Sequence, residues 1–282
     1  MSVSGPSVGV VGHVEWVHFA HVDRVPRAGE VVHARDGFEE PAGGGAVAAV
    51  QLARLAGAAT LVTTLGEDDD GHRAARRLAE LGVVVRARRV PQPTRRAVTL
   101  VDRHGERTIT TFGERLEPVL AEAPERAEAL TALDGVYFTA GDAAALRAAR
   151  AGSRVLVANP RARHALGHGV AIDALVLSAD DEIERREAVR AGGEAELVVW
   201  TEGARGGRYE TRSGETGRWA PAPLGGEPAD SYGCGDSFAA GLTYGLASGM
   251  ELADALALGA RCGARCVTGR GPYERQLTAL DL

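Results

Sequence analysis

The stretch DSYGCGDSFAAGLTYGLASGM, residues 230–250, contains two glycines that bracket a cysteine immediately before an aspartate. Glycine costs backbone entropy on folding, so it usually occurs where the chain approaches another group closely or adopts a conformation that other residues avoid. From Phe238 to Met250, hydrophobic residues recur every four positions, which predicts a helix that begins close to Asp236. The pattern therefore predicts a glycine turn that opens directly into a helix.

Such a turn has the features of an anion site. The first amides of a helix have no partner within it and lie at its positive end, so Gly233, Cys234 and Gly235 can present N–H donors to a phosphate. A carboxylate beside a phosphate is electrostatically costly unless it has a chemical task, and Asp236 can accept a proton from a hydroxyl that attacks phosphorus. The alternative is structural: Asp236 caps the helix and the glycines only form a turn.

The composition is that of an ordinary globular protein. The 282 residues are 45% hydrophobic and 25% charged, which fits a single α/β domain over residues 1–282. A formal net charge of −6 argues against general nucleic-acid binding, which normally requires a basic surface. No apolar run approaches the ~20 residues of a membrane span, and the first residues lack a secretory signal pattern. We therefore expect a cytoplasmic protein with no nucleic-acid or membrane partner.

Lysine is absent, so all 32 residues in the Lys and Arg count are arginines. This excludes a Walker A loop, a protein-kinase ATP site and Schiff-base chemistry, because each requires a lysine. Any phosphate must then be held by backbone amides and arginines. The 3 cysteines are too few and too poorly spaced for a disulfide framework or a zinc site, and we assign no direct metal ligand.

Short hydrophobic runs alternate with helical patterns along the chain. The runs lie at 7–13, 59–66, 134–141, 154–159, 173–178 and 196–203. Continuous apolar strands that alternate with helices indicate a mainly parallel sheet that is covered on both faces. The sequence therefore predicts a doubly wound α/β fold with helices on both faces of the sheet.

Two segments, approximately residues 15–42 and 95–112, interrupt this alternation. Both contain alternating apolar and polar positions with turn signals, and the second has the pattern of a hairpin around DRHGE. We predict that they form a small β-sheet lid inserted within the main domain. The exposed edge of this lid is a candidate for pairing with a second copy of the chain, which would give a homodimer.

A second glycine cluster, Gly43, Gly44 and Gly45, precedes the helical stretch AVAAVQLARLAG. Missing side chains would let a substrate lie against the backbone here, whereas the structural alternative is a tight entry into the helix. The first strand is followed by HVEW and lacks the full G-x-G-x-x-G pattern, so a dinucleotide site is not expected.

Together these segments resemble the ribokinase-like, or PfkB, family of carbohydrate kinases over nearly the whole chain. The stretch DSYGCGDSFAAGL is similar to the family's C-terminal signature, approximately D-T-x-G-A-G-D-x-F-x-x-G. GHVEWVHFAHVDRVPRAGE is similar to its N-terminal strand and lid entry, and the glycine cluster and VVWTEGARGG are similar to two further family segments. The resemblance implies transfer of the ATP γ-phosphate to an alcohol group of a sugar or a sugar-like small molecule.

The resemblance also assigns roles to individual residues. Asp236 would be the base, and the amides of Gly233, Cys234 and Gly235 would form an anion hole for the transferred group. The residues it implies for ATP and its surroundings are Thr201 and Gly203 beside the phosphates, Ala260 and Gly263 beside adenine, and Asp230 near the signature loop or a monovalent cation. Mg²⁺ would be held largely through phosphates and water.

The chain departs from the family pattern at several positions. Ser178 and Asp181 occupy the places of the family's N-x-x-E element, so one carboxylate is retained near ATP. Arg205 is a candidate for the charge that lysine cannot supply, and the alternative is a solvated surface arginine. Where sugar kinases have N-x-D, this chain has Glu15-Trp16-Val17.

The acceptor contacts implied by the resemblance are therefore altered. Glu15 would accept hydrogen bonds from hydroxyls, and Trp16 would stack on a sugar or base unless it belongs to the lid core. Asp142 is a further candidate for a hydroxyl contact, or else the N-cap of the helix that follows it. We therefore do not expect the acceptor to be ribose that is bound in the manner usual for the family. The alternatives are a nucleoside kinase of the same family and a catalytically inactive sugar-binding or regulatory protein on the same fold.

Overall fold

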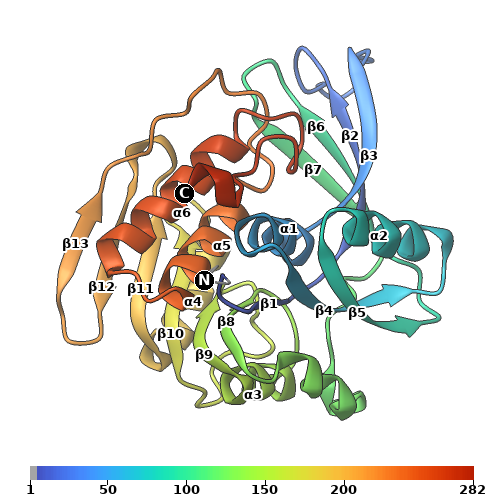
Figure 1. The fold of residues 1–282 in the computed structure, drawn as a ribbon. Coiled ribbons are helices and arrows are strands. Elements are labelled where there is room, and N and C mark those ends of the chain that lie inside the picture. The colour runs from blue at the N-terminus through green and yellow to red at the C-terminus, as the bar shows by residue number, and fades with distance from the viewer. Residues whose placement is uncertain (1–4) are drawn as a thin grey trace.

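A nine-stranded sheet forms the centre of the computed structural model, which describes residues 5–282 (Figure 1). From one edge to the other, its strands are β13 (Thr216–Trp219), β12 (Gly207–Thr211), β11 (Ala195–Thr201), β10 (Ile172–Ser178), β9 (Ser153–Ala158), β8 (Leu133–Phe138), β1 (Val8–Val11), β4 (Ala59–Gly66) and β5 (Val83–Val90). The strands from β11 to β5 are parallel, whereas β12 and β13 are antiparallel additions at one edge.

Helices cover both faces of this sheet, as a doubly wound fold requires. One face carries α1 (Gly44–Ala56), α2 (Asp69–Glu80), α5 (Cys234–Ala247) and α6 (Leu252–Cys266), and the other carries α3 (Ala143–Gly152) and α4 (Glu182–Ala191). Short 3₁₀ turns lie at Leu120–Glu122, Pro124–Leu130, Gly192–Glu194, Gly203–Arg205 and Ala279–Asp281. The predicted fold class is confirmed.

Every strand predicted from a hydrophobic run is present, but three strands are not apparent in the sequence. β5 reads VVVRARRV: it lies at the edge of the sheet, only its first and last residues are buried, and its arginines break the apolar run. The antiparallel pair β12 and β13 is short and largely polar for the same reason. Edge strands therefore escape a search for continuous hydrophobic runs.

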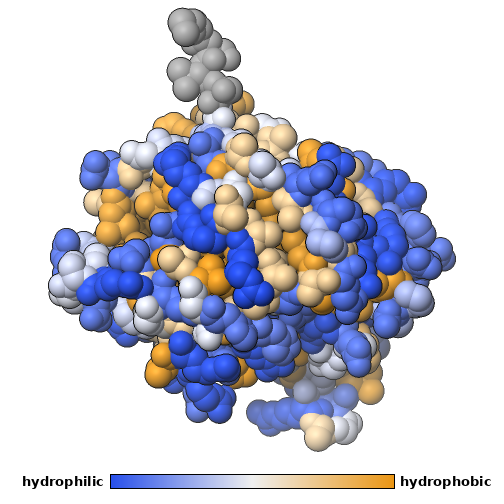
Figure 2. Space-filling view, turned by 90° about the horizontal axis from the view of Figure 1, so that it is seen from below, coloured by the Kyte–Doolittle hydropathy of each residue, from blue (hydrophilic) through white to orange (hydrophobic). Residues whose placement is uncertain are grey.

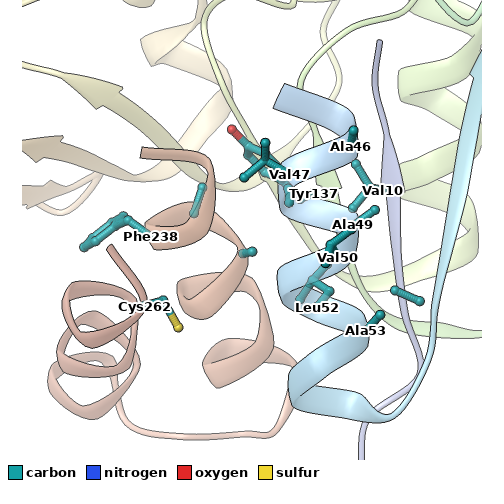
Figure 3. Close-up of a cluster of buried hydrophobic side chains, with 14 of the residues drawn as sticks. Val10, Ala46, Val47, Ala49, Val50, Leu52, Ala53, Tyr137, Phe238 and Cys262 are labelled. Carbon is teal, nitrogen blue, oxygen red and sulfur yellow. The ribbon is translucent and has the colours of Figure 1, made fainter. Parts of the chain in front are cut away.

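The larger hydrophobic core lies between β1, α1 and the C-terminal helices (Figure 3). Val10 of β1 packs with Val50 and Leu52 of α1, and Phe238 and Cys262 extend the same cluster into α5 and α6. Leu52 is fully buried, and burial of such a side chain stabilises the fold by about 1.5–3 kcal/mol. Helix α1 is thus hydrophobic on nearly all sides because it is enclosed by the sheet and α5.

The start of α1 lies directly against the end of β1. A Cβ atom placed on Gly45 would be 2.7 Å from the carbonyl carbon of Gly12 and 2.7 Å from the carbonyl oxygen of His13. Real Cβ atoms do not approach backbone this closely, so only glycine allows this packing. For Gly45, the structural alternative raised by the sequence is therefore correct: it permits a tight entry into the helix.

A second, four-stranded sheet stands apart from the central one and forms the lid (Figure 1). Its strands, in order, are β3 (Asp36–Ala42), β2 (Glu15–His21), β6 (Arg96–Val101) and β7 (Arg107–Phe112). The predicted hairpin is formed by β6 and β7, and β2 joins the two segments by pairing in parallel with β6. The two segments that interrupt the α/β alternation thus form one sheet.

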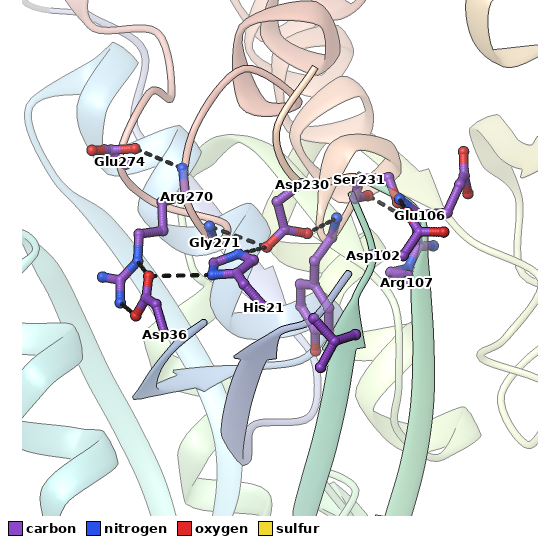
Figure 4. Close-up of polar contacts among 12 residues, drawn as sticks. His21, Asp36, Asp102, Glu106, Arg107, Asp230, Ser231, Arg270, Gly271 and Glu274 are labelled. Carbon is purple, nitrogen blue, oxygen red and sulfur yellow. Dashed lines mark hydrogen bonds and ion pairs between the residues drawn. The ribbon is translucent and has the colours of Figure 1, made fainter. Parts of the chain in front are cut away.

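Hydrogen bonds fasten this lid to the loops that flank α5 and follow α6 (Figure 4). At the hairpin turn, Ser231 N donates to Gly105 O at 2.9 Å, and Arg107 Nη1 donates to Ser231 O at 2.8 Å. At the other side of the lid, Arg270 Nε donates to Asp36 Oδ2 at 2.7 Å. These bonds hold the lid against the loop that precedes α5, residues 230–233, here called the signature loop, and against the loop that follows α6.

The surface seen in Figure 2 is mostly hydrophilic, with hydrophobic side chains scattered between charged ones. Such scattering is normal for the surface of a folded protein. Within residues 5–282, every helix is too short or too polar to cross a membrane.

Replacement of Gly45 by alanine tests the packing of α1 on β1. The added methyl group would collide with backbone of Gly12 and His13, so we expect Gly45→Ala to lower the free energy of unfolding by about 1–3 kcal/mol, as overpacking does. Urea denaturation followed by circular dichroism measures this change. The matched control is Gly193→Ala, because a Cβ at Gly193 has no neighbour within 4 Å. Equal stability of the two variants would contradict the steric argument.

Candidate active site

A cavity of about 620 Å³ lies at the carboxyl ends of the parallel strands. The residues at or just beyond the ends of five neighbouring strands line it: His13 after β1, Thr139 after β8, Asn159 after β9, Ser178 in β10 and Thr201 in β11. From β1 the chain continues to β4 and β5 on one side and later returns to β8 on the other. Doubly wound sheets bind ligands outside such a reversal point.

The other walls come from α1, α5 and the lid. Gly43 and Gly44 lie where α1 begins, and Gly233, Gly235 and Asp236 lie where α5 begins. From β7 of the lid, Arg107, Ile109 and Thr111 line the cavity. The structure thus brings together the two glycine clusters and the lid, which are far apart in the sequence.

Helix α5 opens into the cavity without a capping side chain. Gly233 is its N-cap residue and has φ of +80°, a left-handed conformation that favours glycine. Asp236 is the third residue of the helix, so the alternative in which Asp236 is the cap is wrong. The amides of the first turn are therefore free to bind an anion at the positive end of the helix.

The Cys234 side chain points away from this opening. Its Sγ lies 3.9 Å from the carbonyl oxygen of Asp230, and only its neighbours Gly233 and Gly235 line the cavity. The adjacent thiol of Cys266, together with burial, raises the pKa of Cys234 well above its usual value. Cys234 is therefore held as a protonated thiol, and only its backbone amide is available to the site.

Asp236 lines the cavity and lies against the start of α1. A Cβ atom on Gly44 would be 2.9 Å from Asp236 Oδ1 and 2.9 Å from Thr139 Oγ1. Gly44 thus leaves room for the carboxylate where a side chain would displace it. Burial and the nearby Glu184 raise the pKa of Asp236, Arg107 and Arg161 oppose this shift, and the net pKa is about 6.

A charged network forms the cavity wall beside β10. Arg161 Nε donates to Glu184 Oε1 at 2.6 Å, and Arg161 Nη2 donates to Asp181. Glu184 Oε2 also accepts a hydrogen bond from Ser178 N at 2.8 Å. Ser178 and Asp181 were identified from the sequence and do line the cavity, whereas Arg161 and Glu184 were missed. The available signal for Arg161 was its place directly after a predicted strand.

The opposite part of the cavity, here called the lid-side end, is formed by His13, Glu15, Arg95 and Arg115. His13 Nε2 lies 3.3 Å from Glu15 Oε1, and Arg95 Nη1 lies 3.4 Å from the same oxygen. Arg115 Nη2 donates to Thr139 O at 2.9 Å. Glu15 was the only one of these residues identified from the sequence.

The charges of the lid-side end are determined by burial and by mutual contact. Burial and the positive charge of Arg115 lower the pKa of His13, so this imidazole is neutral near pH 7. Burial opposes ionisation of Glu15, but His13 and Arg95 outweigh it and lower the pKa of this carboxyl. The lid-side end therefore carries two guanidinium groups and one carboxylate.

Two of the predicted acceptor contacts lie elsewhere. Trp16 is buried on the opposite face of β2, and the Arg73 guanidinium stacks over its ring at 4.1 Å. Asp142 is the N-cap of α3, and it accepts hydrogen bonds from Ala145 N at 2.8 Å and Leu120 N at 3.1 Å. Neither side chain lines the cavity, because each belongs to the packing that surrounds it.

Only some of the residues predicted to surround ATP line the cavity. Thr201, Ser178 and Asp181 line the cavity. The other predicted positions lie outside its lining: Gly203 in the turn after β11, Ala260 and Gly263 on α6, and the exposed Arg205 beside Asp180. Asp230 is fully buried, and its carboxylate accepts hydrogen bonds from Tyr232 N at 2.8 Å and Gly271 N at 3.1 Å. Asp230 thus organises the signature loop.

Comparison with known proteins gives consistent matches over this chain. The family described as pfkB family carbohydrate kinase matches residues 6–164 and 170–279. An ATP-dependent ribose-1-phosphate kinase from Halopiger xanaduensis is 27% identical and covers 90% of this chain and 89% of its own length. A fructokinase from Klebsiella pneumoniae is 28% identical, and the match covers 84% of this chain and 90% of the fructokinase. Arabidopsis thaliana ribokinase, solved with ribose and ATP, has a TM-score of 0.73 with 20% identity over 96% of both chains, which shows a shared fold.

The raised pKa of Asp236 predicts a pH-dependent effect on stability. Its pKa is 3.8 when unperturbed and about 6 in the folded protein, so the folded state binds more protons between these values. The wild type should therefore lose stability relative to Asp236→Asn as the pH rises from about 4 to about 6, and the difference should then level off. Urea denaturation of both proteins at several pH values measures this. A difference that does not change with pH would show that the carboxyl titrates normally.

Proposed function

Since this chain belongs to the pfkB family of carbohydrate kinases, we propose that it transfers the γ-phosphate of ATP to an alcohol group of a sugar or a sugar-like small molecule, with Asp236 as the base. The observation that carries this proposal is the position of Asp236 in the uncapped first turn of α5, where it lines the cavity. The acceptor hydroxyl attacks the γ-phosphorus and gives its proton to Asp236, while the bond to the leaving ADP oxygen breaks.

Backbone amides supply the electrostatic part of this mechanism. The first turn of α5, from Gly233 to Gly235, offers N–H donors at the positive end of a helix, where negative charge on the transferred group would be stabilised. Without lysine, the positive side chains of the cavity are all arginines, and Arg107 and Arg161 are the two that most affect Asp236. These two arginines are the candidates for contact with the phosphoryl group while it is transferred.

ATP would extend from this point toward β10 and β11. Thr201 lies in the cavity at this end, and Gly203, Ala260 and Gly263 would border the nucleotide farther out, as their positions in the family pattern imply. The fold is shared with the Arabidopsis ribokinase that was solved with ATP, which supports this placement. The acceptor would then occupy the lid-side end, with Glu15 as a hydrogen-bond acceptor for its hydroxyls.

Mg²⁺ fits this site through phosphates and water rather than through direct side-chain ligands. The carboxylates of Asp181 and Glu184 lie beside the expected phosphates, but both are engaged by Arg161, and backbone amides also donate to them. When bound, Mg²⁺ would neutralise phosphate charge. A monovalent cation near Asp230 stays a prediction.

The lid would exclude water while phosphate is transferred, so that ATP is not simply hydrolysed. Its strand β7 already contributes Ile109 and Thr111 to the cavity wall. β7 is also an exposed edge strand, with Phe112 54% exposed, so it remains a candidate for pairing with a second copy of the chain.

Asp236→Asn tests the role of the base. Asparagine has nearly the same shape but cannot accept the proton, so phosphoryl transfer should fall by roughly 10²- to 10⁴-fold. ATP affinity should be unchanged or higher, because a negative charge near the phosphates is removed. Turnover is measured as acceptor-dependent ADP release, and ATP binding by calorimetry. Near-normal turnover of this variant would disprove the assignment. Tight sugar binding without ADP release in the wild type would instead favour the inactive binding protein.

The pH profile provides an independent test. If the ionised Asp236 is the base, kcat/KM should rise with pH through about 6 and then reach a plateau, because only the deprotonated carboxylate can accept the proton of the hydroxyl. The residual activity of Asp236→Asn should lack this step. A wild-type profile that is flat from pH 5 to 7.5 would contradict Asp236 as the base.

A further inference from the structure

The lid-side end contains two enclosed guanidinium groups, which a neutral sugar does not require. Arg95 and Arg115 are mostly enclosed, with side chains 20% and 22% exposed, and both line the cavity. Glu15 is the single carboxylate that lines this end. Enclosed guanidinium groups are costly unless an anion compensates them. Glu15 lies 3.4 Å from Arg95, and Glu117, which is outside the cavity lining, lies 3.4 Å from Arg115, but the buried Nε of each guanidinium still has no hydrogen-bond acceptor in the described part of the chain.

Several buried polar atoms at this end have no hydrogen-bond partner within residues 5–282. The buried Nε atoms of Arg95 and Arg115 form no hydrogen bond, and neither does the buried Nδ1 of His13. Glu117 Oε1 is 3.4 Å from Arg115 Nε but is not in hydrogen-bonding geometry, and this carboxylate also contacts His164 at 3.2 Å. The polar groups of the lid-side end are therefore incompletely paired.

Other contacts hold the two arginines in place. Arg95 Nη2 donates to Thr111 Oγ1 at 2.7 Å, which ties it to β7, and Arg115 Nη2 donates to Thr139 O beyond β8. One guanidinium is thus attached to the lid and the other to the central sheet. A guanidinium group offers parallel N–H donors that match the oxygens of a phosphate. A group that bridges both arginines would connect the lid to the main domain.

Resting on the proposed kinase function, we propose that the alcohol acceptor already carries a phosphate monoester, which Arg95 and Arg115 bind at the lid-side end. Glu15 opposes an anion close to itself, so it contacts the hydroxyls of the sugar while the phosphate lies toward Arg115. His13 is neutral and so adds no charge, and its Nε2 faces the Glu15 carboxylate at 3.3 Å. A phosphate is favoured over a carboxylate because its two negative charges and three terminal oxygens match two guanidinium groups.

The reaction leaves the existing phosphate ester intact. A free hydroxyl of the sugar phosphate forms a bond to the γ-phosphorus of ATP, the bond between that phosphorus and the β–γ bridging oxygen breaks, and ADP departs with the electron pair. The hydroxyl proton passes to Asp236. The product is therefore a bisphosphorylated sugar.

Matched acceptors test this inference. We expect kcat/KM, measured as ADP release, to be at least ~10²-fold higher for a sugar monophosphate than for the same sugar without phosphate. The panel comprises ribose, ribose 1-phosphate, ribose 5-phosphate, fructose, fructose 1-phosphate and fructose 6-phosphate, with gluconate as a carboxylate probe. A preference for a neutral sugar or for gluconate would overturn the phosphate assignment and leave the kinase function standing.

Arginine variants separate recognition of the phosphate from catalysis. Arg95→Gln and Arg115→Gln should each lower kcat/KM for the preferred sugar phosphate by about 10²-fold, the typical effect of truncating a buried charge pair. The loss on the matching neutral sugar should be clearly smaller, so that the preference for the phosphorylated acceptor falls. Arg115→Lys keeps the positive charge but loses the parallel N–H donors of the guanidinium group, so it should retain intermediate activity. This variant also serves as the test if Arg115→Gln does not fold. The control is Arg190→Gln, on the exposed side of α4. Equal losses on both acceptors would overturn the inference.

Calorimetry keeps this test independent of turnover. If sugar phosphates bind to the wild type but not to Arg95→Gln, and no acceptor in the panel gives ADP release, the phosphate site is supported and the kinase proposal fails. If neither binding nor turnover depends on the arginines, the phosphate site is rejected whatever the reaction is.

Discussion

The close approach of β1, α1 and α5 is the constraint on which the site depends. Where these elements meet, the chain has backbone but almost no side chains: Gly12 touches Gly45, Gly44 borders Asp236, and Gly233 lies against Val47. A methyl group at any of these points would separate elements that must be in contact. The hydrophobic cluster around α1 then stabilises this arrangement, with Leu52 and Phe238 among its members. The position of Asp236 in the cavity is thus a result of packing.

The positive side-chain charge in the cavity comes from arginine alone. Arg161 engages Asp181 and Glu184 on the wall beside β10, whereas Arg95 lies near Glu15 at the lid-side end. Asp236 lines the same cavity, and burial together with Glu184 raises its pKa against the effect of the arginines. A carboxyl with a pKa of about 6 is ionised near neutral pH yet remains basic enough to accept a proton. The same surroundings that make its charge costly therefore suit it to the role of base.

The lid and the signature loop form one connected unit. Arg107 extends from β7 to Ser231 and also lines the cavity, so one side chain contacts the lid, the loop and the interior of the site. The buried Asp230 holds this loop through the amides of Tyr232 and Gly271. A substrate that shifts the lid would therefore act on the start of α5 as well, which couples closure to the arrangement of the anion-binding amides.

The sequence by itself determined the features that depend on local pattern. Continuous hydrophobic runs predicted the parallel strands, alternation predicted the lid hairpin, and the stretch from Gly233 to Asp236 predicted a helix start with a carboxylate beside it. These features follow from a period of two or 3.6 residues, or from the conformational freedom of glycine. None of them requires knowledge of residues far away in the sequence. The same patterns missed β5, because an edge strand has a solvated side and no continuous run.

Only the tertiary structure decided which charged residues share the cavity. Arg95, Arg115, Arg161 and Glu184 have no local pattern that distinguishes them from other charged surface residues, and parallel strands bring them together across long stretches of sequence. It also decided between Glu15 and Trp16, which are neighbours in β2. Successive side chains of a strand point to opposite faces, so Glu15 enters the cavity while Trp16 packs beneath Arg73. The face that meets the ligand depends on where the whole strand lies, which no stretch of sequence specifies alone.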